Sequence, residues 1–435
     1  MTFTVLLTGW RMIDTERATA LRANTVRSGF VHPDYDGYCI SRIPGTAAGV
    51  LDSAVGPTLP NDVFDGIDTT VSNVLVLFVD AYGFDQFQET HSNLPFFDRI
   101  ACRGRVTPLT SVFPSETPSC VPTLHTGLQP VEHGQLGWNL YLPGRDLVVE
   151  PLPFQTKRGD PIDPDDGSLF TETPIYHQLE SEGIDTHIVE PFDSSDDPKT
   201  AGASTHTYTS PADFAVQLRR VLEQSSAPTY CYGYTPLVDA AGHAEGTRSE
   251  RHNAELNCLS ATLKRELCDR LRTDVAEETL LLFIADHGQV DSGSSENVDV
   301  LADPVVDRHL RRDRNGVPAI SGSGRNLHLF VTDGSTDRIH TRLRERLDAL
   351  VLTREEALES NLWGTHGPSK LFTERLGDLV VIPETTTVWH SEEPEELELV
   401  GDHGGLHPRE LLVPFGAVRL DSLAGTDGTS QTILG

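Results

Sequence analysis

The stretch Val74-Leu-Val-Leu-Phe-Val79, followed directly by Asp80, decides the fold that we predict for this chain. Its apolar residues have the length and composition of a buried β-strand. Two later runs, residues 229–234 and 279–285, have the same strand-like character, and each is followed by acids and histidines. In open parallel sheets, ligands bind outside the carboxyl ends of the strands, where residues distant in the sequence come together. We therefore expect a binding site at one edge of a parallel sheet.

The side chains that follow these runs are of the kinds that bind metal ions. Carboxylates and imidazoles together form hydrolytic zinc sites, and also manganese and iron sites. A further histidine lies in the late segment Gly401-Asp-His-Gly-Gly405. The pattern therefore predicts an enzyme that is built around metal ions. The six candidate metal ligands are Asp80, Asp239, His243, Asp286, His287 and His403.

Alternating strands and helices predict an α/β fold with a mostly parallel central sheet that helices cover on both faces. The segment Ser210-Pro-Ala-Asp213 has the N-cap residue, the first-turn proline and the first-turn acid of a helix start. A second predicted helix has leucines at helical spacing between Leu256 and Leu271, and it leads into the strand at residues 280–285. This order of helix and strand is typical of a crossover unit between parallel strands.

The character of the sequence changes after about residue 300, where it becomes polar and rich in arginine and glycine. We predict a strand at residues 327–331, a helix with Leu343, Leu347 and Leu350 on one side, and a strand at residues 379–382.

The last candidate ligand, His403, comes only after this segment. We therefore interpret residues 301–383 as an inserted, cap-like α+β subdomain. Residues 30–300 and 384–435 would form the catalytic core, and residues 1–29 a poorly ordered N-terminal extension.

The charge of the chain is strongly acidic. Lysine and arginine total 34 against 65 aspartates and glutamates, which gives a net charge of −31. The acids are spread along the whole chain, which favours the acidic surface of a protein from salt-loving archaea over a patch for one basic partner. The same charge argues against nucleic acids and anionic membranes as partners, because both bind basic patches.

The six cysteines are widely spaced and contain no C-x-x-C pair, so we expect reduced thiols and a cytoplasmic protein. No stretch is apolar enough to span a bilayer. The first residues lack the basic segment that precedes the apolar run of a signal peptide. The oligomeric state is left open by the sequence.

A second group of residues lies in Phe113-Pro-Ser-Glu-Thr-Pro-Ser-Cys120. Thr117 followed by Pro118 predicts a helix that has threonine as its N-cap and proline as its first residue. A hydroxyl at a helix N-terminus lies where free N–H groups and the positive dipole end favour an anion. A nearby divalent cation would lower the pKa of this hydroxyl, so Thr117 is a candidate nucleophile toward phosphate.

Five motifs follow one another along the chain. They are Phe78-Val-Asp-Ala-Tyr-Gly83, Thr126-Gly127 with Pro130-Val-Glu-His-Gly134, Asp239-Ala-Ala-Gly-His243, Asp286-His-Gly288 and His403-Gly404. In this order they resemble the alkaline phosphatase superfamily, and within it the type I phosphodiesterase/nucleotide pyrophosphatase family. The resemblance covers about residues 71–300 and 386–416. It implies an alkaline phosphatase-like fold and hydrolysis of a small-molecule phosphoester.

The resemblance also implies two divalent cations, with Zn²⁺ expected first and Mn²⁺ or iron as alternatives. One would be bound by Asp239, His243 and His403. The other would be bound by Asp80, Asp286 and His287, with the Thr117 hydroxyl reaching it. Two cations would stabilise the attacking and leaving oxygens while Thr117 attacks phosphorus and forms a covalent phosphothreonine, which water then hydrolyses.

The residues after Thr117 depart from the family pattern. Relatives usually have Phe-Pro-Asn there, whose amide helps to hold a phosphoryl oxygen, whereas this chain has Pro118-Ser119-Cys120. We expect Ser119 or backbone N–H groups to take that role, and His133 to support the site without binding metal. The departure leaves phosphomonoesters and phosphonates open as substrates beside phosphodiesters.

A sulfatase is the nearest enzymatic alternative, because Cys120-Val-Pro-Thr-Leu124 partly matches the Cys-x-Pro-x-Arg motif of that sister family. Leu124 replaces the arginine, and relatives have the nucleophile ten residues before the glycine of Thr-Gly, which is position 117 here. A catalytically inactive metal-binding scaffold is the other alternative, but no ligand or nucleophile has been lost. We expect specificity to come from residues 301–383 and from the loops around Trp138 and Phe154.

Overall fold

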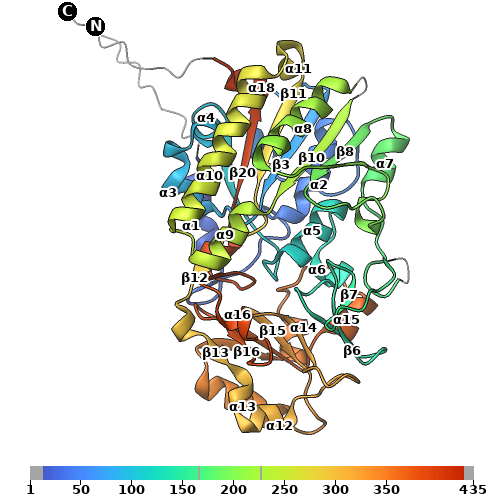
Figure 1. Ribbon diagram of the computed structural model, residues 1–435, viewed down its shortest axis with the longest axis vertical. Helices are drawn as coiled ribbons and strands as arrows, with labels where there is room; N and C mark the ends of the chain where they lie inside the picture. The colour runs from blue at the N-terminus through green and yellow to red at the C-terminus, as the bar shows by residue number, and fades with distance from the viewer. Residues whose placement is uncertain (1–12, 165–166, 226–227, 426–435) are drawn as a thin grey trace, which may run out of the picture.

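The computed structural model describes residues 13–164, 167–225 and 228–425. They form two lobes along the long axis of the molecule (Figure 1). The larger lobe is built on a seven-stranded sheet and the smaller lobe on a four-stranded sheet. No described helix is long and apolar enough to cross a membrane.

The seven-stranded sheet has the order β4-β20-β11-β3-β10-β8-β9. β3 pairs in parallel with β10 and β11, and β8 pairs in parallel with β9 and β10. β20 runs antiparallel to β4 and to β11, so the prediction of a mostly parallel sheet is confirmed. The strands are β3 (Asn73–Val79), β4 (Arg105–Thr110), β8 (Asp185–Glu190), β9 (Ser204–Thr207), β10 (Thr229–Thr235), β11 (Thr279–Ile284) and β20 (Leu412–Arg419).

Every residue of β3, β10 and β11 is buried, because helices cover both faces of the sheet. On one face α8 (Pro211–Gln224) lies so close that a side chain at Gly233 of β10 would collide with Leu218. On the other face, the ring of Tyr232 lies 4.9 Å from that of His125 in α5 (Thr117–Thr126). Successive residues of β10 thus contact helices on opposite sides of the sheet.

Two helices of the larger lobe begin and pack as predicted. Ser210 caps α8, since its hydroxyl accepts a hydrogen bond from Asp213 N at 3.2 Å. α10 (Glu250–Leu263) continues as a π-helical segment (Lys264–Arg270), and its leucines stay buried along the whole length. α11 (Thr273–Glu277) then leads into β11.

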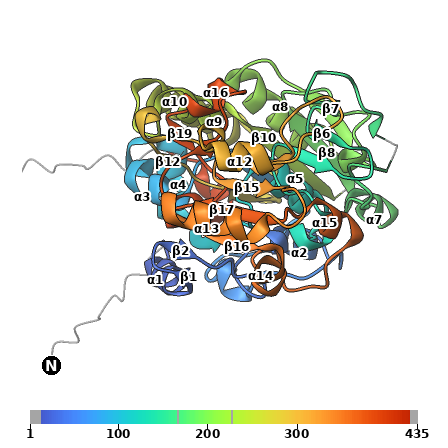
Figure 2. The ribbon, with the colours of Figure 1, turned by 90° about the horizontal axis from the view of Figure 1, so that it is seen from below.

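The smaller lobe contains the antiparallel strands β14 (Ile320–Ser323), β15 (Asn326–Leu329), β17 (Leu379–Pro383) and β16 (Ala349–Thr353). The helices α12 (Pro304–His309) and α13 (Thr336–Arg346) lie over this sheet (Figure 2). Segments from outside residues 301–383 also join the lobe. They are β5 (Leu140–Leu142), β6 (Leu147–Glu150), β7 (Gln155–Thr156), β13 (Val298–Asp299) and β18 (Val388–Trp389). The division of the chain into domains stays a prediction.

Two local predictions differ from the structure. Residues 13–29 are not poorly ordered, because α1 (Thr15–Ala23) buries Ala18 and Leu21 against the core and Arg105 pairs with Asp14 at 2.7 Å. Residues 1–12 of the predicted extension lie outside the described residues. The helix expected to include Leu350 ends at Arg346, since Leu350 pairs with Ile382 as part of β16. Leucines three and four residues apart therefore did not distinguish a helix end from the strand after it.

The remaining elements connect or flank the two sheets. The helices are α2 (Ile43–Val50), α3 (Phe84–Thr90), α4 (Pro95–Arg103), α6 (Pro130–His133), α7 (Tyr176–Ser181), α9 (Leu237–Glu245), α14 (Arg354–Glu359), α15 (Lys370–Arg375), α16 (Pro394–Leu397), α17 (Pro408–Leu411) and α18 (Leu420–Leu423). The short strands are β1 (Thr25–Arg27), β2 (Phe30–Val31), β12 (Val290–Asp291) and β19 (Gly401–Asp402).

Candidate active site

The register of the central sheet brings three strand ends level with one another. Val79 of β3 lies opposite Thr235 of β10, and Phe78 lies opposite Ile284 of β11. Asp80 and the Asp286-His287 pair therefore emerge at the same edge. α5 and α9, which carry further predicted site residues, lie near this edge between the two lobes (Figure 1).

The first group of side chains surrounds His287. Its Nε2 lies 3.4 Å from Asp80 Oδ1 and 3.2 Å from Asp286 Oδ2. Thr117 Oγ1 lies 3.2 Å from the same nitrogen. Thr117, which the sequence predicts as the nucleophile, lies at the N-terminus of α5. Its hydroxyl thus contacts the predicted ligand cluster.

The second group surrounds Asp239. This residue and His243 are four apart on α9, so both face the same way, and His243 Nε2 lies 3.3 Å from Asp239 Oδ2. His403, from the segment after β19, lies with its Nε2 3.6 Å from Asp239 Oδ1 and 3.1 Å from His243 Nε2.

The two groups adjoin each other. The imidazole rings of His287 and His403 are stacked with centroids 3.6 Å apart. Asp239 belongs to both groups by distance. The possible ligand atoms of Asp239, His243 and His403 lie within 4.8 Å of one another, and so do those of Asp80, Asp239 and His287. The structure thus brings all six sequence-predicted ligands and Thr117 into one place.

All three histidines present the same nitrogen to the centre of the site. The Nδ1–H groups of His243, His403 and His287 donate to the backbone carbonyls of Gly401 at 2.8 Å, Ser115 at 3.1 Å and Gly288 at 3.1 Å. When the imidazole is neutral, such a hydrogen bond leaves the lone pair of its Nε2 free to bind a metal ion. Metal-binding histidines are oriented in this way, through a carbonyl or carboxylate on the other nitrogen.

The acids of the site fit a bound cation. Asp80 Oδ1 and Asp286 Oδ2 are buried, and neither has a hydrogen-bond partner. Burial raises the pKa of both carboxyl groups, and for Asp80 the charge of Asp286 raises it further. Buried carboxylates normally require a partner, and a divalent cation between them would satisfy the orphaned oxygens.

The Asp239 group has a different charge balance. Burial opposes ionisation of Asp239, but the neighbouring His243 and His403 lower its pKa below the ordinary value. Burial likewise opposes protonation of His243, yet the Asp239 carboxylate raises the pKa of that imidazole to about 10. Burial lowers the pKa of His403, and the adjacent His287 lowers it further, so this imidazole stays neutral and able to bind metal.

The sequence model of the type I phosphodiesterase/nucleotide pyrophosphatase family matches residues 74–406. The chain belongs to this family. Members of the family hydrolyse phosphoric esters and typically use two metal ions, so this chain is a phosphoester hydrolase, and its structure has candidate carboxylate and imidazole groups for metal binding. No curated protein matches the chain in sequence.

Solved structures show the same fold. Murine ectonucleotide pyrophosphatase/phosphodiesterase 5 has a TM-score of 0.59 and 17% identity, over 79% of this chain and 87% of that chain. Its human counterpart has a TM-score of 0.60 and 16% identity over the same shares. Phosphonoacetate hydrolase from Sinorhizobium meliloti, in complex with phosphonoformate, has a TM-score of 0.59 and 19% identity over 82% and 91% of the two chains.

Three further residues near Thr117 bear on the expectations from the sequence. The Ser119 hydroxyl donates to the carbonyl of Gln135 at 2.8 Å and so does not offer itself to a phosphoryl oxygen. His133 is buried, with its Nε2 3.0 Å from Thr123 Oγ1, so it braces α5 and does not touch the six ligands. Burial raises the pKa of the Cys120 thiol well above its ordinary value, which opposes a cysteine nucleophile of the sulfatase kind.

Thr117 is the first helical residue of α5 and not its N-cap, which is Glu116. The buried Glu116 carboxylate accepts hydrogen bonds from Ser323 Oγ at 2.6 Å and from Trp138 N at 3.1 Å. These bonds join the start of α5 to the smaller lobe. Glu116 was not identified from the sequence, because a single acid in a loop does not indicate a functional role. Its position directly before Thr117 was the one feature that could have suggested such a role.

Two further residues that contact the site were also missed. The Tyr234 hydroxyl donates to Asp80 Oδ2 at 2.6 Å, and Gln289 Nε2 donates to Asp239 Oδ1 at 2.7 Å. Both hold a carboxylate in place beside the centre. Gln289 directly follows the Asp-His-Gly motif, and Tyr234 is the residue before the last of β10. Both residues could therefore have been predicted from their positions next to the motifs.

Proposed function

We propose that this family member is a two-metal phosphodiesterase in which Thr117 is the nucleophile. The observation that supports the proposal most directly is the distance of 3.2 Å between Thr117 Oγ1 and His287 Nε2, at a nitrogen that Asp80 and Asp286 also approach. A hydroxyl in that position would share a cation with these acids. The positive end of the α5 dipole, at Thr117, also favours a phosphoryl anion there.

We assign the six residues to two ligand sets, as the resemblance implies. Asp239, His243 and His403 would hold one divalent cation, and Asp80, Asp286 and His287 the other. When bound, such cations supply positive charge that lowers the pKa of a hydroxyl and offsets the charge of phosphate oxygens. The mixture of oxygen and imidazole ligands suits Zn²⁺, Mn²⁺ and iron, and Zn²⁺ is our first expectation.

The reaction that we propose has two displacements. Thr117 Oγ1 loses its proton and forms a bond to phosphorus while the bond from phosphorus to the leaving oxygen breaks, and the departing alkoxide takes up a proton. Water then attacks the same phosphorus, the bond to Thr117 breaks, and the threonine hydroxyl is restored. The net change is one water consumed for each ester bond cleaved.

Replacement of the nucleophile tests this proposal. Wild type should release p-nitrophenol from bis(p-nitrophenyl) phosphate in concentrated KCl with Zn²⁺ or Mn²⁺. Thr117→Ala should lower kcat by about 10³-fold or more, because the attacking atom is removed. The matched control is Thr19→Ala, which removes an exposed threonine of α1 that does not line the site and should keep wild-type kcat.

Hydrolysis of phosphonates or of phosphomonoesters by the same residues is the second candidate. It is favoured by the absence of an amide after Thr117 and by the engagement of Ser119 with Gln135, which leave one phosphoryl oxygen without the usual side-chain donor. One solved relative in fold was crystallised with phosphonoacetate. A panel of phosphonoacetate, p-nitrophenyl phosphate and bis(p-nitrophenyl) phosphate separates the candidates by their kcat/KM values. Activity toward none of them with either metal would favour the scaffold, and cleavage of p-nitrophenyl sulfate alone would favour the sulfatase.

A further inference from the structure

A cavity of about 590 Å³ opens beside Thr117. α5 contributes Thr117, Val121 and His125, which are four residues apart and therefore line it with one face of the helix. β10 contributes Tyr232 and Tyr234, which are two apart and share one face of the strand. The proposed displacement uses no atom of Val121, His125 or Tyr232, so this volume is available for the organic part of a substrate.

A polar group deep in the cavity has no partner within the protein. Tyr232 is 1% exposed, and its hydroxyl oxygen makes no hydrogen bond. Buried hydroxyl groups are nearly always paired, so an unpaired one that lines a cavity is a candidate partner for a ligand atom. Glu190 lies in the same cavity, and its carboxylate accepts a hydrogen bond from the Ser194 hydroxyl. Burial raises the pKa of Glu190, whereas the hydrogen bond from Ser194 and the charge of Lys199 lower it.

The cavity carries an excess of negative charge beyond the proposed metal ligands. Lys199 is the one lysine or arginine among its described lining residues. The Lys199 ammonium lies 2.7 Å from Asp197 Oδ2 and 4.5 Å from the centre of the Phe154 ring, so one carboxylate of the cavity already pairs with it. The lining carboxylates are Glu190, Asp193, Asp196 and Asp197. Such a cavity repels a group that brings additional phosphates, as in a nucleoside polyphosphate.

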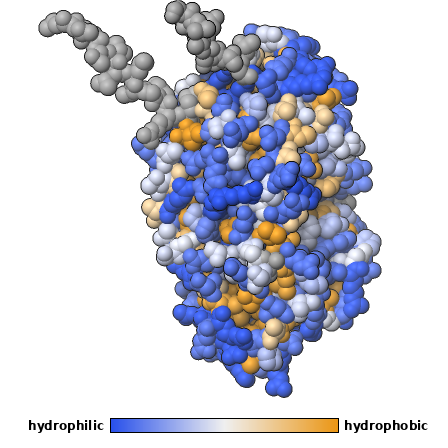
Figure 3. All heavy atoms as spheres, turned by 60° about the vertical axis from the view of Figure 1, so that its left-hand side comes forward, coloured by the Kyte–Doolittle hydropathy of each residue, from blue (hydrophilic) through white to orange (hydrophobic). Residues whose placement is uncertain are grey.

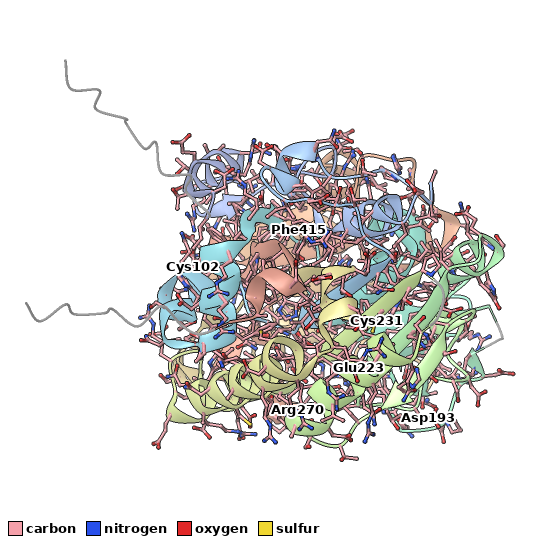
Figure 4. The ribbon with its side chains drawn as sticks, turned by 90° about the horizontal axis from the view of Figure 1, so that it is seen from above. Cys102, Asp193, Glu223, Cys231, Arg270 and Phe415 are labelled. Carbon is pink, nitrogen blue, oxygen red and sulfur yellow. The ribbon has the colours of Figure 1, made fainter. Side chains whose placement is uncertain are left out.

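Aromatic rings complete the entrance. Four large apolar side chains are exposed among the described residues, and two of them, Trp138 and Phe192, line this cavity at 39% and 56% exposure. Asp193, next to Phe192, lies toward the outer edge of the molecule, and Cys231 of β10 lies further inside (Figure 4). A ring face and a nearby carboxylate together bind an ammonium group better than either does alone.

We propose that this cavity binds the organic group of a phosphodiester that carries a primary ammonium on a short alkyl chain. The inference rests on the phosphodiesterase function proposed above and names the class of substrate for the same site. The ammonium would donate to Glu190 and to Tyr232 Oη, while the aromatic rings would cover the alkyl chain. A primary ammonium fits better than a quaternary one, because only the former can donate hydrogen bonds to these two oxygens.

A comparison of chromogenic esters of one leaving group tests the inference. The substrates are the p-nitrophenyl esters of 2-aminoethyl phosphate, ethyl phosphate, phosphocholine and thymidine 5′-phosphate, assayed at pH 7 with the native metal complement. We expect kcat/KM for the aminoethyl ester to exceed that for the ethyl ester by about ten-fold or more, and to exceed that for the choline ester as well.

Two substitutions then assign the preference to the cavity. Glu190→Gln and Tyr232→Phe should each lower the ratio of kcat/KM for the aminoethyl ester over the ethyl ester, by about five-fold or more for Glu190→Gln. This ratio is unaffected by any loss of kcat/KM that is the same for the two substrates. Glu180→Gln, at an exposed glutamate of α7 outside the cavity, is the matched control and should leave the ratio unchanged.

The assay distinguishes failure of the proposed function from failure of the proposed substrate class. Release of p-nitrophenol from none of the esters would overturn the proposed function itself. Equal turnover of the ethyl and aminoethyl esters, or a preference for the thymidine ester, would overturn the inference and leave the phosphodiesterase function standing. Should a substituted protein not fold, the wild-type ratio alone still decides between these outcomes.

Discussion

Asp80 and Asp286 combine burial with incomplete pairing, and this combination makes the site a place of electrostatic repulsion in the absence of a cation. Each residue is buried, and each has one carboxylate oxygen without a hydrogen-bond partner. The raised pKa of both groups, caused first by burial, has the same meaning: their charged forms are poorly stabilised by the protein alone.

Asp80→Asn should therefore have opposite effects on stability with and without metal. In the presence of EDTA the substitution removes one buried charge, and the melting temperature should rise by a few degrees relative to wild type. With excess Zn²⁺ or Mn²⁺, wild type should gain more stability than Asp80→Asn, because the variant has lost a charged ligand. Differential scanning fluorimetry in both conditions measures the two shifts.

Asp146→Asn is the matched control. The Asp146 carboxylate, like that of Asp80, accepts a hydrogen bond from a tyrosine hydroxyl, here that of Tyr141 at 2.8 Å, but Asp146 lies in the smaller lobe. Its melting temperature should respond to metal as that of wild type does. An Asp80→Asn protein that gains as much stability from metal as wild type would contradict the assignment of Asp80 as a ligand.

At the scale of single residues, the sequence predicted the acids and histidines because each follows a strand-like run or stands in a motif. It could not predict which side chains orient them. Tyr234 reaches Asp80 only because β10 pairs with β3 in a register that sets Tyr234 beside Phe78. Ser119 was expected to face the phosphate, but its position on α5 directs its hydroxyl to Gln135.

At the scale of elements, a buried ion pair ties the smaller lobe to the segment that follows His403. Arg325, between β14 and β15, makes two hydrogen bonds of 2.7 Å to the Glu410 carboxylate of α17, and both side chains are fully buried. Arg325 also donates to the carbonyls of Glu384 at 2.9 Å and Thr386 at 3.0 Å. One guanidinium thus holds together three segments that flank the site.

Arg325→Met should lower the free energy of unfolding by about 3–5 kcal/mol, because it leaves the Glu410 carboxylate buried without a counter-charge. Urea denaturation measures the loss. The control is Arg272→Ala, which removes an exposed pair with Asp274 and should change stability little. A loss for Arg325→Met no larger than that of the control would show that the pair contributes no net stability.

Elements with strong local signals were predictable. Residues 74–79 are an uninterrupted hydrophobic run, and they form a strand as predicted. The start of α8 has a serine N-cap, and this helix also begins as predicted. The reversed direction of β20 had no local signal, since strand direction depends on pairing with β4 and β11. Leu350 followed helical spacing yet joined β16, because pairing with β17 outweighed the periodicity.

At the scale of the whole molecule, the dominant property is the net charge of −31. The face in Figure 3 is covered mostly by hydrophilic residues in the larger lobe, with apolar residues showing mainly over the smaller lobe. Adaptation to concentrated salt is our explanation of this charge, and it stays a prediction. Self-repulsion of like charges destabilises a compact state, and salt screens it.

Molar KCl should therefore raise the melting temperature, by about 5–10 °C between 0.1 M and 2 M. Circular dichroism over a KCl series measures the change, and sucrose at matched osmolality serves as the control for effects that do not involve charge. A melting temperature that is insensitive to KCl, or equally sensitive to sucrose, would contradict salt adaptation by charge screening.

The proposed reaction depends on a covalent bond between Thr117 and phosphorus, and trapping that bond is its most direct test. A reaction with bis(p-nitrophenyl) phosphate, quenched in acid within the first turnover and digested to peptides, can be analysed by tandem mass spectrometry. We predict the added mass of a p-nitrophenyl phosphoryl group on Thr117 in wild type, and no such adduct in Thr117→Ala. Turnover by wild type with the adduct absent, or on another residue, would contradict the role of Thr117 as nucleophile.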